Sequence, residues 1–405
     1  MIRHRLRAAL LSCLVVWASA AAQAQTLVLK GGSVYASPEA TPIPDVVIVM
    51  SAGTIAAIGR AGDVQIPADA RVIDCTGKTI VAGFWNSHVH FTEPVWTSAA
   101  KGPAAQLTAH MQAMLTRWGF TTVWDLGSNP AELLPLRQRV NEGEVLGPNI
   151  FFAGSIFPKD GHPAYLPPEI QLPQAATPER AAQLARTYAQ MELDGVKLFT
   201  GSYKGEDKPV VNMDAAIAKA AVDVAHAKRM PVFAHPQNTA GIDVVIAAGV
   251  DVMAHTVTRQ TGYTAEQLAH FKQQNVALTP TLSLFAKLPV PAAISGRIVD
   301  NVVAQLKGFA ENGGTVLFGT DVGFTQLYDT TLEYELMRRA LGERQVLASL
   351  TTAPAAYFKA AKKGRVEQGF DADLVVLDGD PVADVRNLAR VAATIRAGQV
   401  IYQKP

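Results

Sequence analysis

The segment GFWNSHVHFTEP, residues 83–94, carries two histidines, His88 and His90, that are separated by one residue. The residues just before them are too apolar for a loop, so Thr79 to Trp85 is predicted to form a short buried strand. Side chains at positions i and i+2 of a strand point in the same direction. The two imidazoles could therefore hold a metal ion together, or their spacing could be an accident of composition. The rest of the chain has to decide between these interpretations.

Seven further short apolar runs follow, and helical patterns lie between several of them. In one predicted helix Thr177 is the cap and Pro178 lies in the first turn, while residues 214–229 have the Ala-rich amphipathic period of another. Repetition of strand and helix predicts an α/β fold with parallel strands closed as a (β/α)8 TIM barrel, and an open doubly wound sheet is the alternative. The predicted strands lie at residues 79–85, 120–127, 149–157, 195–201, 230–236, 250–256, 275–283 and 314–321.

The two ends of the chain have a different sequence pattern from the middle. Residues 27–80 and the residues from Gly364 onward contain short strand patterns with Gly turns and no helix between them. We expect the two ends to pair into one small β-sandwich beside the barrel. The predicted organisation is a signal peptide at 1–24, the sandwich at 25–80 and 363–405, and the barrel at 81–362.

The first 24 residues have the layout of a cleaved secretory signal. Three arginines precede an apolar stretch, and small residues at Ala22 and Ala24 suit cleavage before Gln25. The stretch is short for a membrane span and contains two serines. The sequence therefore predicts a periplasmic or secreted protein with no stable membrane association after the signal is removed. One cysteine, Cys75, then remains, and it cannot form an intrachain disulfide.

Composition narrows the class of protein. The chain has 405 residues, of which 49% are apolar and 18% charged, and its formal net charge is +1. A chain of this length and apolar content can bury a large hydrophobic core, and this composition excludes a disordered protein. No basic stripe suggests nucleic acid or an anionic membrane as partner. A small-molecule substrate is expected, and the sequence is compatible with a homo-oligomer.

Further metal-ligand residue types fall at the ends of other predicted strands. His235 ends the fifth strand, His255 the sixth and Asp321 the eighth, while Lys197 lies inside the fourth. In a parallel barrel these ends meet on one face. Each residue alone is more often a packing or turn residue, but joint placement on five strands is hard to obtain by chance. His110, His226 and His270 fall in helical patterns and are assigned no chemistry.

Lys197 interrupts an apolar strand, where an unpaired buried ammonium is costly. Its stem could pack inside while its head reaches polar groups. Alternatively, its amine has reacted with carbon dioxide to give a carboxylate that can bridge two divalent ions. The second interpretation also removes the cost of burial, because the anion would face two cations.

Together these residues resemble the amidohydrolase superfamily, in its two-metal form with a carboxylated lysine, over nearly the whole chain after the signal. GFWNSHVHF is similar to the strand-one HxH motif, GVKLF to the lysine strand, FAHP and MAHT to the single-histidine strands, and GTD to the final aspartate. The C-terminal GRVEQGFDADLVVLDGDP resembles the return to the sandwich. The lysine-containing spacing and the tail ASLTTAPAAYF are most similar to the imidazolonepropionase-related and Xaa-Pro dipeptidase-like branch. Asn86 departs from the pattern, since an acidic residue is common there, but it is not a ligand.

The resemblance implies a set of ligands and a mechanism. His88, His90 and Asp321 would hold one ion, His235 and His255 the second, and carboxylated Lys197 would bridge them. A water shared by the ions would lose a proton near neutral pH and attack a carbonyl that a metal polarises. Asp321 would take that proton and deliver it to the leaving nitrogen. Zinc suits this donor set, and manganese or cobalt is also compatible.

The predicted reaction is hydrolysis of a carbon–nitrogen bond in a dipeptide or N-acyl amino acid. Tyr203 and Arg259, in loops after the fourth and sixth strands, would hold the substrate carboxylate. His162, with Lys159 nearby, would donate to the scissile carbonyl. Each of these residues could instead be a solvated or packing residue. A cyclic-amide hydrolase or deaminase, a lactonase, esterase or phosphotriesterase, and a non-catalytic metal-binding module are the alternative functions.

Overall fold

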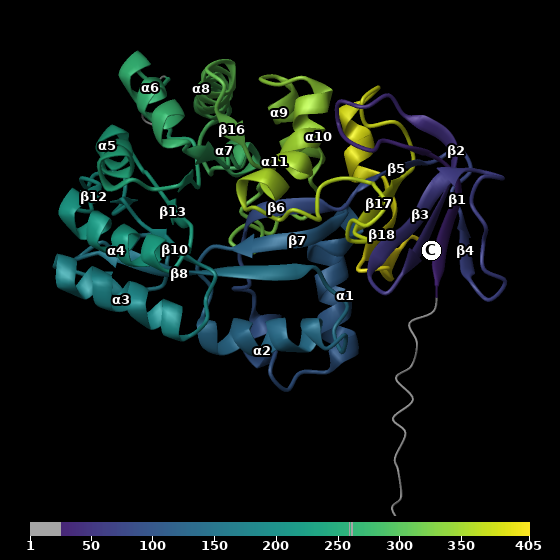
Figure 1. Cartoon of the computed structure of the whole chain (residues 1–405). Coiled ribbons are helices and arrows are strands. Elements are labelled where there is room, and N and C mark those ends of the chain that lie inside the picture. Colours follow the sequence, from purple (N-terminus) through teal and green to yellow (C-terminus); the bar gives the residue numbers. More distant parts are fainter. Residues whose placement is uncertain (1–25, 259, 261) are drawn as a thin grey trace, which may run out of the picture.

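The computed structural model describes residues 26–258, 260 and 262–405. The predicted signal peptide lies outside the described residues. The chain forms a parallel sheet with helices around it and a second, mixed sheet built from both chain ends (Figure 1). None of the described helices is long and apolar enough to cross a lipid bilayer.

Eight parallel strands form the barrel sheet, and they follow one another in chain order. Its first strand is joined to the segment just after the last strand by backbone hydrogen bonds from Ser87 N to Phe318 O (2.7 Å) and from Asp321 N to His88 O (2.9 Å). All eight predicted strand positions are occupied, which confirms the TIM-like barrel. The strands are β6 (Phe84–Val89), β7 (Phe120–Asp125), β8 (Asn149–Pro158), β10 (Gly195–Leu198), β13 (Val232–Ala234), β14 (Val252–Met253), β15 (Ala277–Leu278) and β16 (Thr315–Val316).

Helices and short accessory elements connect these strands. As predicted, the Thr177 side chain caps α3 by accepting a hydrogen bond from Arg180 N, and Pro178 opens the first turn. The helices are α1 (Ala104–Met114), α2 (Pro130–Asn141), α3 (Pro178–Gln190), α4 (Ala215–Ala227), α5 (Thr239–Ala248), α6 (Ala265–Gln274), α7 (Leu282–Ala286), α8 (Ala292–Glu311), α9 (Thr331–Arg338), α10 (Glu343–Leu350) and α11 (Thr352–Tyr357). The short elements are η1 (Pro94–Ser98), η2 (Thr116–Trp118), η3 (Val385–Ala389), β9 (Gln174–Ala175) and the hairpin β11 (Gly201–Ser202) and β12 (Val211–Asn212).

The second sheet joins the two ends of the chain. Its order is β19-β18-β17-β5-β1-β2-β3, with β4 beside β1, so the central pair β17 and β5 unites the C-terminal and N-terminal parts. This confirms that the chain ends pair, although hydrogen bonding makes them one continuous mixed sheet. An apolar cluster that includes Leu29, Ile48, Ile80 and Val376 forms its core. The strands are β1 (Leu27–Val34), β2 (Ile43–Ser51), β3 (Thr54–Arg60), β4 (Arg71–Asp74), β5 (Thr79–Ala82), β17 (Leu374–Leu377), β18 (Val391–Arg396) and β19 (Gln399–Gln403).

The prediction of a single strand from Thr79 to Trp85 is wrong. The chain leaves the mixed sheet after β5 and enters the barrel at β6, with Gly83 between them. A Cβ atom at Gly83 would lie 2.2 Å from Thr121 Oγ1, so only glycine permits this close passage between the two sheets. Both strands are buried, and an apolar run indicates burial without revealing that the chain changes sheets.

Candidate metal centre

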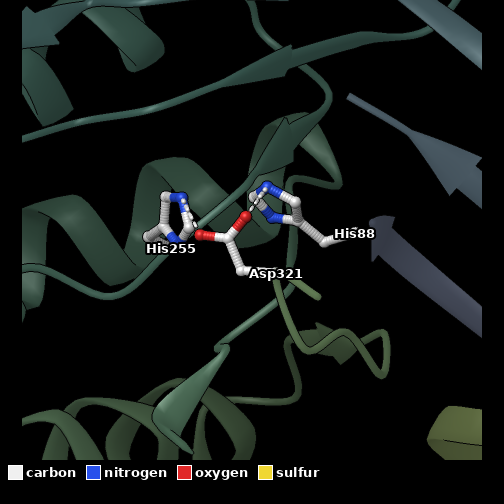
Figure 2. A group of neighbouring side chains, drawn as sticks. All are labelled: His88, His255 and Asp321. Atoms are coloured by element: carbon white, nitrogen blue, oxygen red, sulfur yellow. Dashed lines mark ion pairs between the residues drawn. The ribbon is translucent and has the colours of Figure 1, made fainter. Parts of the chain in front are cut away.

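A buried cluster of His88, His255 and Asp321 lies at the carboxyl end of the barrel strands (Figure 2). His88 belongs to β6, whereas His255 follows β14 and Asp321 follows β16. His88 Nε2 is 3.3 Å from Asp321 Oδ1, and His255 Nε2 is 3.8 Å from Asp321 Oδ2. One ligand atom from each of the three residues can lie within 4.8 Å of the others. Three separate strands thus bring metal-ligand atoms to one point.

The other three predicted ligands adjoin this cluster. His90 Nε2 lies 3.0 Å from Asp321 Oδ1, and the ring centroids of His235 and His255 are 4.7 Å apart. Lys197 projects from β10 and is 1% exposed. Burial lowers the pKa of Lys197 to about 8, although the Asp321 and Asp125 carboxylates act in the opposite direction. All six predicted ligands therefore converge at one end of the barrel.

The imidazoles of the cluster are held neutral. Burial, followed by the charge on Lys197, lowers the pKa of His88 well below its ordinary value. Burial lowers the pKa of His235 to about 4, and burial also holds the pKa of His255 well below its usual range. Neutral imidazole is the form that binds metal ions, so the site needs no proton release from these rings before an ion enters.

Hydrogen bonds orient the rings toward the centre. His88 Nδ1 lies 2.9 Å from the carbonyl oxygen of Ala254, which can only accept, so Nδ1 carries the proton and Nε2 is left as an acceptor. Among the described residues, His88 Nε2 and Asp321 Oδ1 are buried side-chain atoms without a hydrogen-bond partner. Two acceptors facing each other without a donor would repel, and a cation between them removes that repulsion. The residues present therefore fit a metal ion.

The backbone around Asp321 is shaped for close approach to β6. Asp321 has a left-handed φ of 60°, which costs energy and is typical of functional sites. Two residues later a Cβ atom at Gly323 would lie 1.6 Å from His90 O, so only glycine lets this turn lie against the histidine strand. Asn86 ties the same elements together, since its amide donates to Thr320 Oγ1 (2.8 Å) and its oxygen accepts from His88 N (3.2 Å). Asn86 is thus a connecting residue beside the ligands.

Asp125 is a buried carboxylate at the carboxyl end of β7 that the sequence analysis missed. It ends β7, is fully buried, and accepts hydrogen bonds from Phe91 N (3.0 Å), Gly127 N (2.9 Å) and Ser128 N (2.8 Å). The bond from Phe91 N fixes the chain immediately after His90, while the other two hold the turn that follows β7. The same rule that selected the other strand-end residues, applied to the second strand, would have found it.

A second missed group connects the loops after β6 and β16. Glu93 is buried, and Tyr328 donates its hydroxyl hydrogen to the Glu93 carboxylate, with distances of 2.7 and 2.6 Å to its two oxygens. His110, on α1, also contacts the Glu93 carboxylate. The ring of His110 is therefore a structural partner of these loops, and its helical sequence context carried no signal of that role.

The contact that orients His255 depends on a buried glutamate. His255 Nδ1 lies 2.7 Å from Thr281 Oγ1, immediately before α7. Glu333, on α9, is fully buried and accepts hydrogen bonds from Leu282 N (2.8 Å) and Ser283 N (2.6 Å) at the start of α7. Glu333 thereby holds the turn that places Thr281 against the His255 ring.

Replacing Glu333 with glutamine is expected to change how stability depends on pH. Burial raises the pKa of Glu333 from 4.5 to about 7, against the opposite effect of the amides of Ser283 and Leu282. Because this folded-state pKa lies above the unfolded one, the stabilising effect of the proton is complete below pH 4.5 and is lost as the pH rises through 7. Between pH 5 and pH 8 the free energy of unfolding, measured with urea, should fall by roughly 2 kcal/mol more for wild type than for Glu333→Gln. Glu335→Gln, at an exposed position of α9, is the control, and parallel profiles for wild type and Glu333→Gln would contradict the assignment.

Three of the four predicted substrate residues, His162, Tyr203 and Lys159, lie in described loops that follow β8 and β10. His162 is engaged within its own loop, since its Nδ1 lies 3.0 Å from Pro163 O and its Nε2 3.2 Å from Ile170 O. Tyr203 is half-buried, and its carbonyl accepts a hydrogen bond from Ala164 N (2.8 Å). Lys159 is exposed, and Arg259 lies outside the described residues. The substrate contacts of these four residues stay predictions, and His162 would have to leave its loop partners to reach a substrate.

Comparison with known proteins agrees with this geometry. The model of the amidohydrolase family matches residues 79–401, which include every predicted ligand. The chain belongs to the amidohydrolase family. It is therefore a hydrolase that acts on carbon–nitrogen bonds, and the resemblance stated from its motifs is confirmed.

Several solved structures and one curated relative are similar to this chain of the amidohydrolase family. A structure described as a putative prolidase from Bifidobacterium longum has a TM-score of 0.78 and 24% identity, with coverage of 94% of this chain and 95% of that one. A Xaa-Pro dipeptidase with bound methionine in the active site has a TM-score of 0.78 and 22% identity, with coverage of 94% and 100%. Ochratoxinase from Aspergillus niger is 21% identical in sequence, over 85% of this chain and 80% of its own length. At these identities the solved structures establish the fold, and the resemblance to the dipeptidase-like branch is in accord with them.

Proposed function

We propose that this protein is an exported amidohydrolase that binds two divalent metal ions and hydrolyses the amide bond of a dipeptide or an N-acyl amino acid. The observation that carries the proposal is the convergence of four histidines, one aspartate and one lysine at the carboxyl end of the barrel strands. A packing role alone would not require two buried acceptors, His88 Nε2 and Asp321 Oδ1, to face each other.

The family resemblance divides the ligands between two ions, and His255 lies close to both groups, with its ring centroid 4.6 Å from that of His88. His88, His90 and Asp321 would hold one ion, since the nearest distances from the two imidazoles to the carboxylate are 3.3 and 3.0 Å. His235 and His255, whose rings are 4.7 Å apart, would hold the second. The mixed imidazole and carboxylate donors suit zinc.

Carboxylation of Lys197 would complete the site. Lys197 is 1% exposed and its charge lowers the pKa values of His88, His235 and His255, so a cation lies among groups that should bind cations. Conversion of the amine to a carbamate replaces that positive charge with a negative one. The resulting carboxylate could bridge both ions, which agrees with the lysine strand of the family.

The residues of this chain then have separate tasks in amide hydrolysis. Bound divalent ions acidify water and polarise the substrate carbonyl. Asp321, which the turn after β16 holds against β6, takes the proton of the attacking water and gives it to the leaving nitrogen. Asp125 and Asn86 keep the histidine strand in place during this transfer.

The proposed substrate class rests on two points: the predicted residues that could hold a substrate's free carboxylate, and the similar solved structures. Prolidase and Xaa-Pro dipeptidase structures share the fold, and the names of those proteins describe cleavage of small peptides. Tyr203 and Arg259 would hold the substrate carboxylate, while His162, with Lys159 nearby, would donate to the scissile carbonyl and steady its developing negative charge. The basic start, apolar stretch and small residues of the first 24 positions support export to the periplasm or the medium.

Metal analysis combined with a substrate screen tests this proposal. The mature protein should contain two divalent ions per chain, and removal of the ions with a chelator should abolish turnover until zinc, manganese or cobalt is returned. The metal-loaded protein should hydrolyse dipeptides or N-acyl amino acids faster than cyclic amides, lactones or phosphotriesters. Full activity with one ion or fewer would overturn the two-metal assignment, and preference for lactones or ring compounds would replace the dipeptide assignment.

A further inference from the structure

Two large aromatic side chains are exposed on loops at the carboxyl end of the barrel. Tyr165, in the loop after β8, is 40% exposed, and Phe324, in the loop after β16, is 43% exposed. Their rings meet edge to face with centroids 5.2 Å apart. Because only seven large hydrophobic side chains are exposed among the described residues, a contacting pair of them is unusual for a solvated surface.

The pair lies beside the metal centre. In the closed barrel β6 and β7 separate β16 from β8, so contact between their loops brings the two rings together near the histidine strand. Phe324 is three residues from Asp321, in the turn that Gly323 holds against His90.

The loop that carries Tyr165 is held by contacts that do not involve the Tyr165 side chain. His162 bonds to the carbonyls of Pro163 and Ile170 within the loop. Lys204 Nζ donates to Asp160 O (2.9 Å) and to His162 O (2.8 Å), which fastens the loop to the hairpin after β10. Tyr165 is thus presented on a fixed loop, with much of its ring available for contact.

We propose that Tyr165 and Phe324 form an aromatic clamp that receives an aromatic side chain adjacent to the scissile amide of the substrate. The inference rests on the proposed function and names its substrate class. A third ring can pack against an edge-to-face pair with favourable geometry and removes exposed apolar surface from water. The clamp therefore selects phenylalanine-like over alanine-like substrates by roughly 10- to 100-fold.

Matched pairs of substrates test the clamp. Wild-type protein should show a kcat/KM roughly 10-fold or more higher for N-acetylphenylalanine than for N-acetylalanine. If the substrate is a dipeptide, the same preference should appear for Phe-Ala or Ala-Phe over Ala-Ala. Phe324→Ala and Tyr165→Ala should bring that preference ratio close to one, whereas Phe324→Leu and Tyr165→Phe should keep most of it. Ile170→Ala, an equally exposed apolar position of the Tyr165 loop, is the control and should leave the ratio unchanged.

Calorimetric binding of the same N-acetyl amino acids, with and without metal, separates the clamp from catalysis. Tighter binding of the phenylalanine compound that is lost in Phe324→Ala supports the clamp even if no amide is hydrolysed, in which case only the proposed function fails. Amide hydrolysis with equal kcat/KM and equal affinity within each pair overturns the clamp and leaves the proposed function standing. A ratio that Ile170→Ala changes as much as Phe324→Ala also overturns it, because selectivity would then belong to the loop as a whole.

Discussion

Asp321→Asn is expected to lower kcat/KM for amide hydrolysis by roughly 10³- to 10⁴-fold without unfolding the protein. The carboxylate is the proposed proton carrier, and it approaches His88, His90 and His255 at 3.3, 3.0 and 3.8 Å. Asparagine keeps the size of the side chain but cannot accept and return a proton. The fold should survive, because the backbone bond from position 321 to His88 O does not depend on the side chain. Steady-state kinetics with circular dichroism and thermal melting provide the check.

Asp207→Asn makes the same chemical change in an exposed loop of the β11–β12 hairpin and serves as the matched control. It should leave kcat/KM within about twofold of wild type, because exposed groups away from such a site contribute little. A wild-type rate in Asp321→Asn would remove Asp321 from the reaction. Equal losses of kcat/KM in Asp321→Asn and Asp207→Asn would point to a general effect of negative charge at the carboxyl end of the barrel.

The barrel and its ligands were predictable because both obey short-range rules. Parallel buried strands appear as apolar runs, and side chains at their carboxyl ends must meet, so His235, His255 and Asp321 could be placed from their strand positions alone. The change of sheets at Gly83 obeyed no such rule. It depends on the contact of Gly83 with Thr121, which is 38 positions away in the chain and is visible only once the two sheets are packed.

The residues that support the ligands were hidden for the same reason. Glu333 reaches the start of α7, and Tyr328 reaches Glu93, across gaps in sequence that carry no periodic signal. His162 shows a different limit, because its position after the third strand suggested a catalytic donor, whereas the structure adds that its ring is engaged by two carbonyls of its own loop. Strand-end position thus predicts which side chains reach the centre. It does not predict which loop residues are already occupied by hydrogen bonds.

Lys197→Ala is expected to reduce bound metal from two ions per chain toward one and to lower kcat/KM by about 10³-fold or more, since a lost bridging ligand removes several kcal/mol of transition-state stabilisation. The substitution also leaves a cavity on buried β10 among His88, His235 and His255. Short carboxylates such as acetate should enter that cavity and restore part of the metal content and rate, because they supply the missing bridging oxygens.

The control is Lys208→Ala, in the exposed part of the β11–β12 hairpin, which should change neither the metal content nor kcat/KM. Mass spectrometry of native wild-type protein should show the added mass of carbon dioxide, and the Lys197→Ala protein should lack it. If Lys197→Ala instead keeps two ions and full activity, the lysine is a packing residue whose ammonium tolerates burial, and the two ions must be bridged by Asp321 or by solvent alone.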